Sequence, residues 1–77
     1  MKYDEILSRV ISLFSMYTDA TDISAESEIM HDLEISSMDV LSLICNIEEE
    51  FGIQVSEKSL RKIFTISDVA DIIIDSL

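Results

Sequence analysis

Residues 37–51 carry two apolar rows at helical spacing, and this double pattern limits the folds that the chain can adopt. At about 100° per residue, the first row falls within a narrow arc, as expected for the side of a helix that packs into a hydrophobic core. The pattern therefore predicts an amphipathic helix over these residues. The predicted core face consists of Val40, Leu43, Ile44, Ile47 and Phe51.

The second apolar row, which we call the docking strip, consists of Met38, Leu41 and Cys45 on nearly the opposite side of the same helix. The carboxylates of Glu48 and Glu49 lie beside it. An apolar strip with a charged rim is typical of a surface that binds a partner. The alternative is that a second layer of the same protein covers the strip, although 77 residues leave little chain for such a layer.

Two serines precede the apolar rows. Ser36 is suited to the N-cap position, and Asp39 follows three residues later, as in a capping box with Asp in place of Glu. Ser37 then takes the first helical position, with its side chain towards solvent. The exposed amides and the dipole of a helix N-terminus favour a negative group such as a phosphate, which makes Ser37 the candidate functional residue. The alternative is that both serines only cap the helix.

Four parts of the sequence together resemble the signature of the acyl carrier protein family. They are Asp32–Leu33, Ser37–Asp39, Leu43 and Ile47–Ile53, against a family pattern of Asp-Leu-Gly-x-Asp-Ser-Leu, a helix, and Leu-Glu-Glu-Glu-Phe. The resemblance continues to the C-terminus and covers most of the chain. It implies that Ser37 carries a 4′-phosphopantetheine arm, derived from coenzyme A, through a phosphodiester.

The sequence departs from the family pattern at three positions. Glu34 stands where the family has Gly, Ser36 where it has Asp, and Met38 where it has Leu. Without the Asp of the family pattern at position 36, a standard phosphopantetheinyl transferase is expected to recognise this protein less well. The hydroxyl of Ser36 is also an alternative acceptor for the arm. Together the departures favour a dedicated pathway over housekeeping fatty acid synthesis.

The resemblance implies a carrier that is not itself an enzyme. Such a protein holds acyl or aminoacyl groups as thioesters on the arm and presents them to enzymes of fatty acid, polyketide or related biosynthesis. The implied partners are a phosphopantetheinyl transferase and acyl-transferring and chain-modifying enzymes with basic docking patches. The alternative is an unmodified helical adaptor that kept the fold and the docking strip but not the arm.

Two further groups of residues follow from the resemblance. Partner docking is assigned to Met38, Asp39, Leu41, Cys45, Glu48 and Glu49. A space for the acyl chain would be lined by Leu43, Ile47, Leu60, Ile63 and Val69, residues that the ordinary core also needs.

The charge of the chain excludes several functions. It has 16 acidic residues against five Lys and Arg, a formal net charge of -11, and no Lys or Arg between Val10 and Glu57. A nucleic-acid-binding protein needs the opposite sign. A field this negative attracts basic partners and repels anionic membranes.

The sequence offers no catalytic or metal-binding set. His31 and Cys45 are each the single residue of their type, and there is no Gly-rich loop. The acids of residues 21–28 lack the spacing and the central Gly of an EF-hand, so a calcium-binding module is a distant alternative. The N-terminus lacks a signal-peptide pattern, and no apolar run reaches the roughly 20 residues of a membrane span. We therefore expect a monomeric cytoplasmic protein without membrane insertion.

The remaining segments complete an all-α prediction for a single domain over residues 1–77. Helical spacing over 3–17 precedes a polar link over 18–36, and a short helix over 57–62 and a last helix over 66–76 follow the central one. We expect an acyl-carrier-like bundle of three main helices and one short helix, with a long loop between the first two. Because the link is long, apolar side chains should hold it down. The candidates are Ile23, Ile29, Met30, Leu33 and Ile35.

Local signals mark where the elements begin and end. Gly52 is placed to cap the C-terminus of the central helix. Ser56 and Thr65 are placed as N-caps, and Asp68 gives the second of these the spacing of a capping box. Phe64 is expected at the surface, because the residues beside it are better placed for the core.

Overall fold

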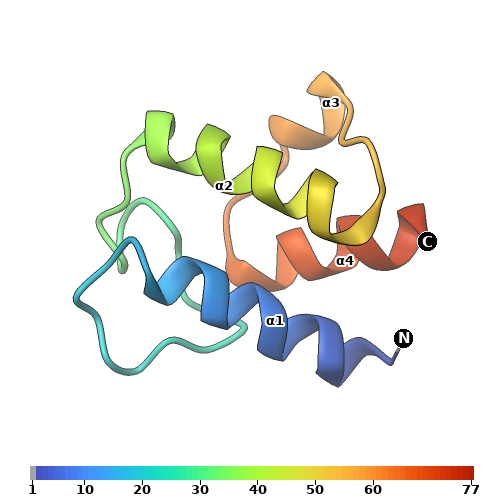
Figure 1. Cartoon of the computed structure of the whole chain (residues 1–77). Coiled ribbons are helices and arrows are strands. Elements are labelled where there is room, and N and C mark those ends of the chain that lie inside the picture. Colours follow the sequence, from blue (N-terminus) through green and yellow to red (C-terminus); the bar gives the residue numbers. More distant parts are fainter. Residues whose placement is uncertain (1) are drawn as a thin grey trace.

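The computed structural model describes residues 2–77, and this part of the chain folds into four α-helices (Figure 1). They are α1 (Tyr3–Ser15), α2 (Ser37–Phe51), α3 (Glu57–Leu60) and α4 (Ile66–Ser76). α1 packs mainly against α4, and α2 lies beside the pair (Figure 1). The expected bundle of three main helices and one short helix, with a long loop between the first two, is confirmed.

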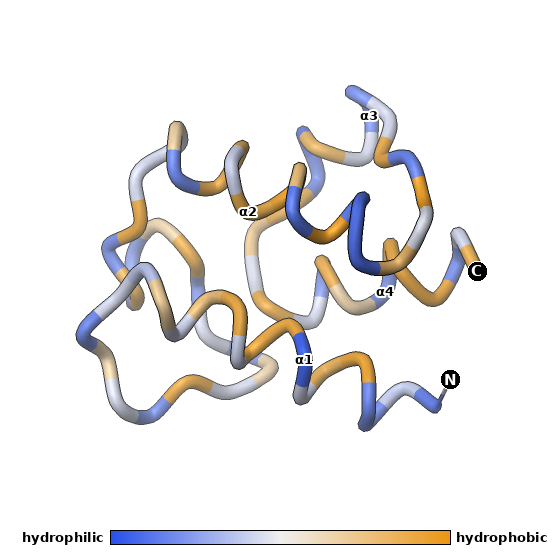
Figure 2. The backbone as a smooth tube through the Cα atoms, in the orientation of Figure 1, coloured by the Kyte–Doolittle hydropathy of each residue, from blue (hydrophilic) through white to orange (hydrophobic). Residues whose placement is uncertain are grey.

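Each of the three long helices contributes one apolar face to a common core. Because one face of each helix is buried and the other is exposed, hydrophobic and hydrophilic stretches alternate along each helix in Figure 2. The predicted core face of α2 is confirmed, with Val40 and Phe51 half-buried at its two ends. The buried helical residues are Ile6, Val10 and Phe14 of α1, Leu43, Ile44 and Ile47 of α2, and Ile66, Val69, Ala70 and Ile73 of α4.

The expected caps fix where the helices begin and end. At α2, the Ser36 side chain accepts a hydrogen bond from the Asp39 backbone N–H at 3.2 Å, which is one half of the predicted capping box. At α4 both halves form, because the Thr65 hydroxyl accepts from the Asp68 N–H and the Asp68 carboxylate accepts from the Thr65 N–H. Gly52 ends α2 in the left-handed conformation, with a φ of 65°.

The long link between α1 and α2 is fastened to the start of α4. Ile29, Leu33 and Ile35 are buried, as predicted, and three backbone hydrogen bonds join the link to residues 64–67. We call these three bonds the clasp. In the clasp, the N–H of Ile29 donates to the Phe64 carbonyl at 3.0 Å, that of Ile66 to Ser27 at 3.1 Å, and that of Ser67 to Ala25 at 2.9 Å. The clasp and the buried side chains together explain how so long a connection is ordered.

The ends of two helices and the position of Met30 differ from the prediction. The first helix ends at Ser15 rather than at residue 17, and the short helix ends at Leu60 rather than at residue 62. The N–H groups of Met16 and Tyr17 after α1, and those of Lys62 and Ile63 after α3, bond to the carbonyl three residues back, which tightens the last turn. Met30 is 61% exposed rather than packed down, because the neighbouring Ile29 takes the core position.

Candidate functional site

Ser37 is the first residue of α2, and its side chain is exposed. The adjacent Ser36 is also exposed, but its hydroxyl oxygen is engaged as the N-cap of the helix. The two serines therefore differ in what they do: one holds the start of α2, and the other presents a hydroxyl at the positive end of the helix dipole. Such a hydroxyl suits a phosphodiester, because the amides of the first turn favour its negative charge.

The three residues of the docking strip lie on the surface, as their position on α2 predicts. Met38 is 78% exposed, Leu41 is 54% exposed, and Cys45 is an exposed free thiol. Within residues 2–77, no second layer buries them. Asp39 and Glu49 are exposed on the same helix, so the strip has carboxylates near both of its ends.

Glu48 is placed differently from the other predicted docking residues. It is half-buried, and its Oε2 accepts a hydrogen bond from the Val55 backbone N–H at 2.8 Å. Its backbone carbonyl also accepts from the Ile53 N–H at 3.1 Å. Glu48 thus holds the segment after α2 against the helix, which is a structural contribution that its position in the sequence pattern does not reveal.

A cavity of about 280 Å³, which we call the Ser37 cavity, opens beside Ser37. Ser37 lines it together with Val40 and Leu41 of α2. All the lining residues except Ser37 are apolar, so the cavity suits an uncharged aliphatic group. The link contributes Ile29 and Met30 to the lining, and α3 with the loop after it contributes Leu60, Ile63 and Phe64.

The Ser37 cavity brings together two of the five residues predicted to line an acyl-chain space, namely Leu60 and Ile63. The other three, Leu43, Ile47 and Val69, are at most 1% exposed and belong to the core. Sequence reasoning missed the residues that the link and the loop before α4 bring to the cavity wall, because contacts between distant segments leave no local pattern. These missed residues are Ile29, Met30 and Phe64.

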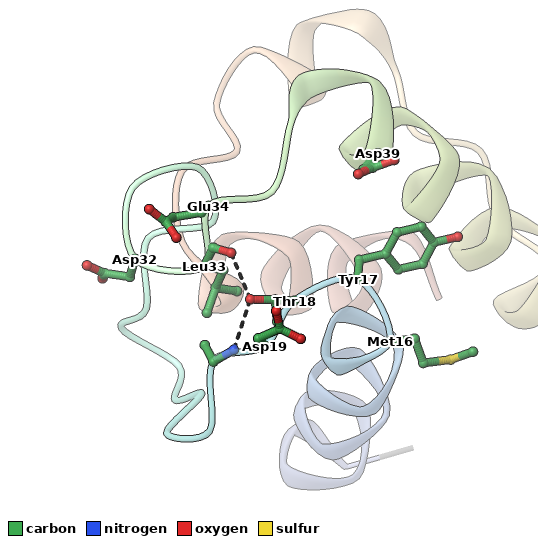
Figure 3. Close-up of a pocket in the computed structure, with 9 residues that line it drawn as sticks. Met16, Tyr17, Thr18, Asp19, Asp32, Leu33, Glu34 and Asp39 are labelled. Carbon is green, nitrogen blue, oxygen red and sulfur yellow. Dashed lines mark hydrogen bonds between the residues drawn. The ribbon is translucent and has the colours of Figure 1, made fainter.

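A larger cavity of about 620 Å³ lies between the end of α1, the link and the first turn of α2 (Figure 3). Figure 3 shows Thr18 within it, where the Thr18 hydroxyl donates to the Leu33 carbonyl at 2.7 Å. Its acidic lining makes it unsuited to an apolar acyl group. In the described part of the chain, no group of three His, Cys, Asp or Glu side chains is arranged to hold a metal ion. The carboxylates in the lining are those of Asp19, Asp32, Glu34 and Asp39.

The distribution of basic side chains leaves the α2 surface acidic. Arg9 pairs with Glu50 at 3.6 Å, and Arg61 pairs with Glu57 at 3.9 Å within the region of α3. α2 itself contains no Lys or Arg, and Arg9 of α1 pairs with Glu50 in its last turn. The exposed carboxylates of Asp39 and Glu49 are therefore the charges that a visiting basic surface meets beside the docking strip. From residue 2 onwards, no helix is both long enough and apolar enough to cross a membrane.

Comparison with known proteins identifies the family. A family model described as the phosphopantetheine attachment site matches residues 4–73. The acyl carrier protein of Thermotoga maritima is 33% identical over 72 residues, which cover 91% of this chain and 89% of that protein. The chain belongs to the acyl carrier protein family. An acyl carrier protein of Helicobacter pylori is 36% identical over 58 residues, which cover 75% of this chain and 74% of that protein.

A solved structure supports the same family at the level of the fold. The acyl carrier protein from Enterococcus faecalis superposes with a TM-score of 0.85 and 26% sequence identity, and the match covers 100% of both chains. This agreement extends the family likeness over the whole chain, including the link and α3.

Membership of the acyl carrier protein family gives the general function. The chain carries a covalently attached 4′-phosphopantetheine group and is a carrier rather than an enzyme. Carriers of this family work with a phosphopantetheinyl transferase and with biosynthetic enzymes. The residues at the start of α2 fit this group, because an exposed hydroxyl at a helix N-terminus provides both an attachment atom and favourable partial charges.

Proposed function

We propose that Ser37 carries the 4′-phosphopantetheine arm and that the docking strip directs the loaded arm to enzymes of fatty acid, polyketide or related biosynthesis. The main support is the exposed Ser37 hydroxyl at the start of α2, beside an apolar cavity. The engagement of Ser36 in the N-cap supports Ser37 over its neighbour. The arm supplies the thiol that holds the acyl group, while the protein supplies recognition and shelter.

Docking in this proposal depends on apolar contact first and on charge second. Met38, Leu41 and Cys45 offer apolar area that water covers in the free protein. Asp39 and Glu49 attract partner enzymes with basic patches and help to set their orientation. Glu48 contributes negative charge as well, but part of its role is to hold the segment after α2.

Shelter in this proposal is provided by the Ser37 cavity. Leu60 and Ile63 line it and are half-buried against the core. We infer that these two residues contact the acyl chain, and that Leu43, Ile47 and Val69 support the wall through core packing. The departures at Glu34, Ser36 and Met38 favour a dedicated biosynthetic pathway, and we place the protein in the cytoplasm as a monomer.

The attachment residue is tested by loading the purified protein with coenzyme A and a phosphopantetheinyl transferase of broad specificity. Intact mass should rise by one 4′-phosphopantetheine group in the wild type and in Ser36→Ala, but not in Ser37→Ala. Fragmentation of the modified peptide should place the group on Ser37. A mass gain in Ser37→Ala that Ser36→Ala lacks would move the attachment to Ser36. No gain in the wild type with any of several transferases would favour the unmodified adaptor.

A further inference from the structure

Phe64 is a large apolar side chain that remains at the surface beside the Ser37 cavity. It is 63% exposed and lines the cavity. Its backbone is held on both sides, because its carbonyl accepts from the Ile29 N–H at 3.0 Å and its N–H donates to Asp68 Oδ2 at 2.8 Å. A phenyl ring has two rotatable bonds, so on a backbone held this firmly it forms a wall of defined position.

Met30 lines the same cavity from the link. It is 61% exposed and directly follows Ile29, whose N–H belongs to the clasp. Because the clasp joins the segments that carry Phe64 and Met30, it also sets the separation of their backbones. Methionine is unbranched and polarizable, so Met30 adapts its shape to what lies between it and Phe64.

The size and chemistry of the cavity limit what it accepts. A volume of about 280 Å³ lies just below the roughly 300–1,000 Å³ of small-molecule pockets, so the cavity is sized for a short chain. Of the residues that the structure describes, no ionisable side chain lines the cavity. A carboxylate at the end of a cargo group would therefore lose water without gaining a partner.

We propose that Phe64 and Met30 form the outer wall of the Ser37 cavity and limit the sheltered cargo to short, uncharged aliphatic acyl groups. This inference rests on the proposed attachment of the arm at Ser37. It assigns the limit on chain length to two exposed residues that the core does not require. Replacement of Phe64 by Ala should open the wall and let longer chains be sheltered.

The test loads the arm with acetyl, butyryl, succinyl, octanoyl or dodecanoyl groups and checks each product by intact mass. The protein is labelled with ¹³C in its methionine methyl groups. The Met30 resonance should shift between the holo and the butyryl and octanoyl forms, and should stay in place in the succinyl form. Met16 lies outside the cavity lining and serves as the internal control.

Melting temperature measures the limit on chain length. In the wild type it should rise from the acetyl to the octanoyl form and gain nothing further with dodecanoyl. In Phe64→Ala it should continue to rise to dodecanoyl, and Phe64→Leu should lie between the two. Leu77→Ala is the matched control, because Leu77 is 60% exposed at the far end of α4, and it should behave as the wild type.

The outcomes separate this inference from the proposed function. If the arm is loaded but Phe64→Ala and the wild type respond to chain length in the same way, the wall is not formed by Phe64. An unmoved Met30 resonance in the octanoyl form would overturn the inference as well. If no arm can be attached at Ser37, the proposed function fails, and the inference that rests on it fails too. Melting of each unloaded variant verifies that it is folded.

Discussion

The Ser36 hydroxyl oxygen lies 3.2 Å from the Asp39 backbone nitrogen and accepts its hydrogen bond, so the two adjacent serines at the start of α2 have separate roles. Ser and Asp are both preferred N-caps. The departure from the family pattern at Ser36 therefore keeps the cap of the helix while it removes one negative charge beside Ser37. The position of Ser37 relative to the first turn of α2 depends on this cap.

Ser36→Ala should lower the free energy of unfolding by about 1 kcal/mol, because the Asp39 N–H loses its acceptor. Ser36→Asp should retain the stability of the wild type. Ser37→Ala is the control and should change stability by less than about 0.5 kcal/mol, because Ser37 is exposed and provides no cap. Urea denaturation of the three variants measures these differences. Equal losses in Ser36→Ala and Ser37→Ala would contradict the separation of roles.

Glu48 and Glu49 are adjacent, but their replacement should have different effects. Glu48→Ala should lower the free energy of unfolding by about 1–2 kcal/mol, because the Val55 N–H loses a charged acceptor. Glu49→Ala should leave stability unchanged and lower the kcat/KM of arm transfer about 2–5-fold, as expected for one exposed docking charge. Urea denaturation and transferase kinetics at low and high salt distinguish the two. The prediction for Glu49 fails if added salt does not reduce the difference from the wild type.

Glu34→Gly should stabilise the protein. Glu34 has a φ of 55°, a conformation that favours glycine, and the family has Gly at this position. Relief of about 1–2 kcal/mol of backbone strain, less about 0.5–1 kcal/mol for the added freedom of the unfolded chain, leaves a gain of up to about 1.5 kcal/mol, centred on ~0.8 kcal/mol. Glu34→Gln removes the charge but keeps the Cβ, so it should not give this gain. A gain of similar size in both variants would point to charge repulsion instead of strain.

Alkaline pH should destabilise the fold through Tyr3. Burial raises the pKa of the Tyr3 phenol, and nearby carboxylates, with Asp71 the foremost, raise this pKa further. The folded state therefore favours the neutral phenol, so the contribution of Tyr3 to stability is complete below about pH 10 and is lost as pH rises through its raised pKa. Tyr3→Phe should weaken this alkaline loss. Absorbance of the ionised phenol in a Tyr17→Phe background follows Tyr3 alone, and a midpoint at or below that of the urea-unfolded protein would contradict the prediction.

The helices could be predicted from the sequence because their signals are local. The rows of α2, the N-cap at Ser36 and the C-cap at Gly52 each depend on residues within a few positions of one another, and all of them are present in the structure. The docking strip could be placed for the same reason. Its exposure follows from the direction in which a helix presents each side chain.

The Ser37 cavity could not be predicted, because its wall depends on contacts between segments far apart in the sequence. The clasp consists of backbone hydrogen bonds, which carry no signature of residue type, and it is the clasp that brings Met30 and Phe64 together. Helical spacing also does not distinguish a core position such as Leu43 from a cavity position such as Leu60. The hydrogen bond of Glu48 could not be predicted for a related reason, since its partner is a backbone N–H beyond the end of its helix.

The clasp has a consequence for how cargo leaves the protein. It fastens the Met30 and Phe64 side of the cavity to α4, which is packed against α1. The lining also includes Leu60 of α3, a helix of four residues, none of them buried. Displacement of so small a unit requires far less free energy than global unfolding. Release of the acyl group would then proceed by local opening at α3, and the hydrophobic interior shared by the three long helices would stay intact through every delivery cycle.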